Sequence, residues 1–104
     1  MQSATVNDFA LGLKEIGQLC NECNLPNLLV VEPDLIDFSS LLDRELVAFS
    51  LALDLLFLRI RQRVVFSRHH RLYSDLKANA KQAGELIYKE RVKRGVFFPS
   101  KAIH

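Results

Sequence analysis

The stretch from Leu35 to Phe66 contains neither proline nor glycine, and it constrains the fold more than any other part of the chain. Every side chain between residues 46 and 58 is apolar except Ser50 and Asp54. On a helix, polar residues spaced 7, 4 and 7 apart make one narrow stripe, and here they are Asp43, Ser50, Asp54 and Arg61. A helix that is apolar around most of its circumference must be covered on most sides. Two other helices from one chain of 104 residues would strain to cover it, so this stretch predicts self-association.

The rest of the chain also favours an all-α fold. Leu is abundant, while Gly and Pro number only four and three, a mix that favours helix over sheet. A chain of this length supports one domain over 1–104. We expect a three-helix or four-helix bundle with a long central helix, assembled as a dimer. The spacing of the apolar residues predicts helices over about 5–23, 34–66 and 68–94, a loop over 24–33 and a C-terminal strap over 95–104.

The joint between the second and third helices has no strong turn signal. Residues 66–71 contain no Gly or Pro, and Ser67 is the predicted N-cap of the third helix. The alternative is one continuous helix from about 35 to 94, roughly 90 Å long at 1.5 Å per residue. Such a rod could not bury its apolar faces alone, so both arrangements point to self-association.

The first and third helices carry packing signals. Gly17 lies on the apolar face of the first helix and predicts a close helix approach there, while Thr5 followed by Asp8 resembles a capping box. Gly95 occupies the position of a C′ glycine that ends the third helix. That helix has a heptad-like seam formed by Phe66, Tyr73, Ala80 and Ile87, with Leu76 and Ala83 between them.

Charge is divided along the chain. Residues 1–58 carry two basic and nine acidic groups (2 − 9 = −7), whereas residues 59–104 carry twelve basic and three acidic groups (12 − 3 = +9). A polarised chain offers a cationic surface to a partner, which can be internal or external. The candidate binding residues of this basic face are Arg59, Arg63, Arg68, Arg71 and Lys77. Alternatively, the acidic half neutralises these cations within the fold or across a dimer, with Asp43 and Asp54 set against the basic helix.

These features predict a small non-enzymatic binding or regulatory module, located in the cytoplasm. It self-associates through the second helix and presents its basic face to an acidic partner, either nucleic acid or an acidic protein surface. The candidate interface residues are Leu51, Leu55, Phe57 and Leu58. An alternative is a protein–protein adaptor, chaperone or inhibitor with no nucleic-acid role.

A second alternative is a dimeric ribonuclease. Arg63 precedes His69 by six residues, with His70 adjacent. This spacing loosely resembles the Arg–His pair of HEPN-type helical ribonucleases, in which dimer contact brings two copies together. The resemblance implies His as acid or base and Arg as a phosphate clamp. The likeness covers two residues, and Val64 stands where a polar residue usually follows the Arg.

Other chemistry finds no support in the sequence. Cys20 and Cys23 form a single CxxC, whereas a structural zinc site needs four ligands, so we expect Cys20 in the core and Cys23 as a bystander. We expect no catalytic site, no metal and no cofactor, since the chain has no Gly-rich phosphate loop and no nucleophile motif. The longest apolar stretch is shorter than the roughly 20 residues that cross a bilayer, so no membrane partner is expected.

Overall fold

The computed structural model describes the backbone of residues 2–95 and the side chains of residues 7–95. This part of the chain contains no strand, and the predicted all-α class with three helices is confirmed. The helices are α1 (Gln2–Glu22), α2 (Asp43–Val64) and α3 (His70–Arg94). Two short 3-10 turns, η1 (Pro33–Leu35) and η2 (Phe38–Ser40), lie between α1 and α2.

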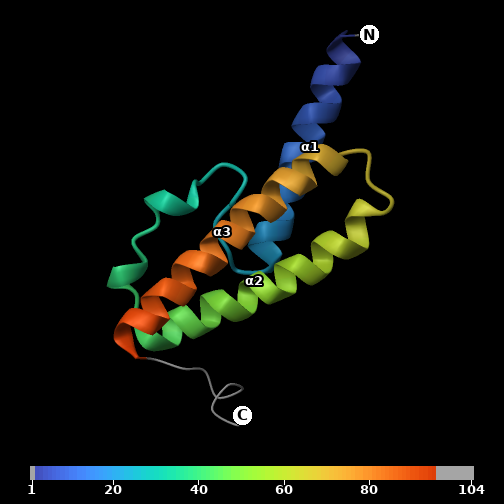
Figure 1. Ribbon diagram of the computed structural model, residues 1–104. Helices are drawn as coiled ribbons and strands as arrows, with labels where there is room; N and C mark the ends of the chain where they lie inside the picture. The colour runs from blue at the N-terminus through green and yellow to red at the C-terminus, as the bar shows by residue number, and fades with distance from the viewer. Residues whose placement is uncertain (1, 96–104) are drawn as a thin grey trace.

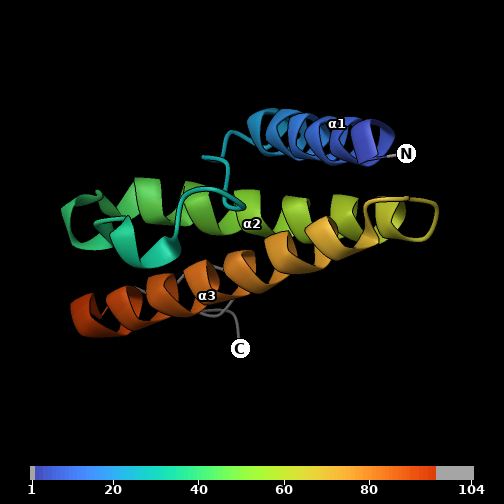
Figure 2. The same cartoon turned by 90° about the horizontal axis from the view of Figure 1, so that it is seen from above.

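α2 and α3 form an antiparallel hairpin, and α1 crosses it obliquely (Figures 1 and 2). The N-terminal part of α1 extends beyond the hairpin (Figure 1). Both η1 and η2 contact α3, so the connection from α1 to α2 covers the far half of that helix. The hairpin therefore has one flank covered by the rest of the chain, and much of the surface of α2 away from α3 is left to solvent.

The predicted seam of α3 is the centre of the core. Tyr73, Leu76, Ala80, Ala83 and Ile87 are all buried. They belong to one cluster with buried residues of α1 and α2, among them Ile16, Leu19, Leu46, Leu53, Leu56 and Ile60. Phe66, the first residue of the predicted seam, is 88% exposed, because α2 ends at Val64 and Phe66 falls in the turn.

The central helix begins later than predicted, at Asp43 and not near residue 34. Pro33 does start a helical turn, but it is the 3-10 turn η1. Asp37, Ser39 and Ser40 bond to one another locally: the Ser39 hydroxyl donates to the Asp37 carboxylate, and the Ser40 hydroxyl donates to the Asp37 carbonyl. Such short-range bonds offer the backbone an alternative to the helix. α3, with 25 residues, is therefore the longest helix of the described chain, and α2 has 22.

A single charged side chain ties the open ends of the hairpin together. Arg94, at the end of α3, donates to the carboxylates of Glu90 and Asp43 and to the carbonyl oxygens of Phe38 and Ser39. Arg94 is therefore a structural cation, and its pairing with Asp43 agrees with the alternative in which acidic residues neutralise the basic helix within the fold.

The continuous helix from 35 to 94 is wrong. The chain turns at residues 65–69, where the Ser67 hydroxyl accepts a hydrogen bond from the His69 N–H at 2.9 Å. The N-cap residue of α3 is His69 and not Ser67. Ser67 lies two residues before the N-cap and forms a local side-chain turn that needs neither Gly nor Pro.

Close approach in α1 occurs at Gly12 and not at Gly17. A Cβ at Gly12 would lie 2.6 Å from Cδ1 of Leu72 and 2.8 Å from Nδ1 of His69, whereas one at Gly17 would make only an ordinary 3.5 Å contact with Asn27. The helix begins at Gln2, so Thr5 is not its N-cap. Gly95 has φ 71° and caps α3 in the left-handed conformation, as predicted. The predicted strap over 95–104 lies, beyond Gly95, outside the described residues.

Candidate functional site

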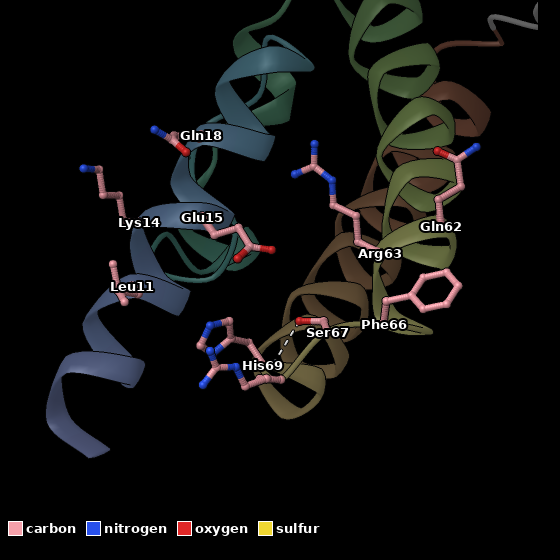
Figure 3. A pocket seen from close by; sticks show the side chains of 10 residues that line it. Leu11, Lys14, Glu15, Gln18, Gln62, Arg63, Phe66, Ser67 and His69 are labelled. Atoms are coloured by element: carbon pink, nitrogen blue, oxygen red, sulfur yellow. Dashed lines mark hydrogen bonds between the residues drawn. The ribbon is translucent and has the colours of Figure 1, made fainter. Parts of the chain in front are cut away.

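A cleft of about 810 Å³ opens between α1 and the turn that joins α2 to α3 (Figure 3). It lies where three elements meet, because Gly12 lets α1 approach the first turn of α3. Eight of its ten lining residues are polar, and these include three cations and one carboxylate. The lining residues are Leu11, Lys14, Glu15, Gln18, Gln62, Arg63, Phe66, Ser67, Arg68 and His69.

A buried tyrosine lies next to the cleft. The Tyr73 side chain is fully buried and its hydroxyl donates a hydrogen bond to the Glu15 carboxylate. Burial, followed by this bond to a negatively charged group, raises the pKa of Tyr73 to about 12. Sequence reasoning missed the pair, because Glu15 and Tyr73 are far apart in the chain and neither belongs to a local motif.

Three of the predicted binding cations are already paired with acidic residues of α1. Arg59 and Arg63 approach the Glu22 carboxylate at 3.3 and 3.6 Å, and Arg68 approaches Asp8 at 3.9 Å. In the close view, the Glu15 side chain extends from α1 toward the hairpin across the cleft (Figure 3). The cations nearest the cleft therefore hold α1 against the hairpin.

The cleft also brings together Arg63 and His69, the pair that resembles the ribonuclease arrangement. Each of them contacts the protein itself: Arg63 pairs with Glu22, and the His69 ring packs against Gly12. His70 does not face the cleft but lines a hollow on another flank of the hairpin, beside Arg61 and Lys77. Arg63 and His69 therefore make contacts that hold α1 in position.

A second group of cations lies on the outer face of α3, which we call the α3 basic face. All five members are exposed, and none forms an ion pair with another described residue. Only Asp75 and Glu85 offset them on that face, which gives 5 − 2 = +3. The members are Arg71, Lys77, Lys81, Lys89 and Lys93. Of the predicted basic residues, Arg71 and Lys77 thus belong to a different surface from Arg59, Arg63 and Arg68.

The predicted interface residues also divide into two sets. Leu51, Leu55 and Leu58 are 61%, 39% and 48% exposed on the outer side of α2. Phe57 is half-buried and lines hollows between α2 and α3 instead. α2 therefore has an apolar side that the described part of the chain leaves exposed, as its sequence indicates.

Other candidate sites are not formed. Cys20 and Cys23 are both buried and unbonded, and burial raises the pKa of both thiols. Cys23 is thus a core residue and not the predicted bystander. No group of three or more possible metal ligands occurs among the described residues. No helix within residues 2–95 has the length and apolarity of a membrane span.

Similarity to known proteins does not assign the site. No protein-family model matches the chain, and neither curated proteins nor solved structures give a significant match.

Proposed function

We propose that this chain is a non-enzymatic helical binding module that self-associates and presents a basic surface to an acidic partner. The observation that carries the proposal is the division of the cations. Those beside α1 are paired with Glu22 and Asp8, whereas the α3 basic face has no acidic partner among the described residues. The binding surface is therefore assigned to α3, with Arg71 and Lys77 at its start and Lys93 at its end.

The partner proposed for this face is a phosphate backbone. The cations are spread along about six turns of one helix, as a linear array of charges would need. No aromatic RNA-binding motif or helix-turn-helix signature accompanies them. Binding by this face is therefore mainly electrostatic and independent of base sequence.

Salt dependence tests this proposal directly. The chain is titrated with a mixed-sequence duplex at several salt concentrations, starting near 50 mM, where binding to phosphates is strong. Replacing Lys77, Lys81 and Lys89 by Gln is expected to lower the slope of log affinity against log salt by up to about 2.7, since each phosphate that is no longer neutralised removes roughly 0.9. Replacing Arg59, Arg63 and Arg68 by Gln is the matched control, because these three cations already have an acidic partner. Absence of any binding at the lowest salt contradicts the proposal.

A second candidate is a protein–protein adaptor. It is favoured by two hollows of about 420 Å³ each between α2 and α3, whose linings include no residue of α1. Leu53, Phe57 and Ile60 contribute their apolar side chains. Such a groove accepts an amphipathic helix. This candidate predicts no retention on nucleic acid, together with loss of the protein complex on Phe57→Ser.

A further inference from the structure

α2 carries two apolar seams on opposite sides. The buried seam is formed by Leu46, Leu53, Leu56 and Ile60. At about 100° per residue, Leu51 lies half a turn of the helix away from Ile60. The second seam runs along that outer side with spacings of 3, 4, 3, 4 and 3, through Ala48, Leu51, Leu55, Leu58, Gln62 and Val65. Alternation of three and four is the spacing of a coiled-coil interface.

The outer seam is open to solvent, and Gln62 is its one polar member. Val65 keeps helical φ and ψ as the C-cap residue and is 72% exposed, so the register extends to the end of α2. Ala48, a small residue, lets a facing helix approach at the other end. Beside the seam, Leu51 and Leu55 also line a hollow of about 530 Å³ that reaches Cys23 at the end of α1. A row of exposed leucines with this spacing indicates an interaction surface.

Two charged residues beside the outer seam indicate which kind of partner would cover it. Asp54 and Arg61 are seven residues apart and flank the same edge of the seam. Both are exposed, and neither forms an ion pair with another described residue, although Asp54 shares a hollow with Lys81 and Lys89. A two-fold axis near the centre of the seam would bring Asp54 of each copy against Arg61 of the other. The edge is therefore complementary to itself.

A parallel pairing is less compatible with the same charges. Across a parallel coiled coil, the residue at the position of Asp54 faces one five residues further on in the other helix, which here is Arg59. Arg59 already pairs with Glu22, on the edge of α2 where α1 docks. In the antiparallel arrangement, the Asp54–Arg61 ion pairs form on the edge that α1 leaves free.

We propose that the outer seam of α2 is covered by the same seam of a second copy in antiparallel orientation. Leu55 then faces Leu58 of the other copy, Leu51 faces Gln62, and Ala48 faces Val65. Two Asp54–Arg61 ion pairs fix the register. The inference rests on the self-association in the proposed function, and adds to it the orientation and the residues that specify it.

Charge exchange tests the orientation. Sedimentation equilibrium measures the dimer dissociation constant of Asp54→Arg, of Arg61→Asp and of the double variant. Each single change replaces two attractions by two repulsions and is expected to weaken the dimer about tenfold, whereas the double variant regains the wild-type constant. An equimolar mixture of the two single variants is likewise expected to form a heterodimer as stable as the wild-type dimer.

Asp75→Arg is the matched control, because it makes the same charge change at an exposed position of α3 and is expected to leave the dimer unchanged. Circular dichroism establishes that every variant keeps its helical content. A double variant weaker than either single variant overturns the antiparallel register, even if the wild-type chain dimerises and binds a polyanion. A wild-type chain that stays monomeric overturns the inference, and polyanion binding by the α3 basic face is then measured separately.

Discussion

The two sides of α2 have similar compositions and different surroundings. Leu56 is fully buried against the rest of the core, whereas its neighbour Leu55 is 39% exposed. Both belong to rows with the alternating spacing of a helix interface. The difference shows that the pattern of leucines indicates where a helix needs a partner, while the packing of the other helices decides which of its sides is covered.

Adjacent leucines provide the strongest test of this contrast. We expect Leu56→Ala to lower the free energy of unfolding by about 2–5 kcal/mol, because it leaves a cavity in the core. Leu55→Ala should cost less than about 1 kcal/mol when the protein is dilute enough to be monomeric. Denaturant unfolding at low concentration measures both values. Equal costs would mean that the outer side of α2 is enclosed within a single copy.

A substitution at Tyr73 tests how strongly α1 is held against the hairpin of α2 and α3. Tyr73→Phe removes the hydroxyl that donates to Glu15 and is expected to cost about 1 kcal/mol. The same residue predicts an alkaline transition. Because folding raises the pKa of Tyr73 from 10.0 to about 12, its contribution to stability is complete below pH 10 and is lost as the pH rises from 10 to about 12.

Ultraviolet absorbance of tyrosinate follows this ionisation directly. The wild-type chain is expected to show a component near pH 12 that is absent from Tyr73→Phe. The stability of the variant should also decline less between pH 10 and 12 than that of the wild type. A wild-type titration curve that lacks the component near pH 12 would show that Tyr73 does not lie in the buried, hydrogen-bonded position described above.

The smallest effect is expected from the ion pairs that fasten α1. Glu22→Gln should cost less than about 1 kcal/mol of stability, since partly exposed ion pairs contribute little. It should also raise polyanion affinity, because Arg59 and Arg63 lose their acidic partner. Glu32→Gln changes the same charge at a position outside these ion pairs and is the control. A gain no larger than that of the control would show that these arginines are not held by Glu22.

The parts of the fold that follow from local patterns were predictable from the sequence. The seam from Tyr73 to Ile87 repeats every seven residues, and Gly95 ends α3 where a left-handed residue is needed. The late start of α2 was not predictable from periodicity, because Asp37, Ser39 and Ser40 form local bonds that compete with the helix.

The candidate site depended on contacts between distant parts of the chain. Gly12 and Gly17 look alike in the sequence, and only the crossing of α1 over α3 decides that Gly12 is the point of close approach. Likewise, the sequence places Arg63 and Lys77 in the same basic region. In the structure, Glu22 pairs with Arg63 but not with Lys77. The net charge of a region was therefore predictable from the sequence. Which of its cations remain unpaired and accessible to a partner was not.

The most direct test of the central claim is the mass of the wild-type chain in solution, measured by size-exclusion chromatography with light scattering over a range of concentrations. The two-seam description of α2 predicts twice the mass of one chain, and a single-chain mass for the double variant Leu51→Ser with Leu58→Ser. Val30→Ser with Leu35→Ser, at exposed apolar positions away from α2, is expected to remain dimeric. A wild-type chain that keeps the mass of one well-folded copy at every concentration contradicts the claim.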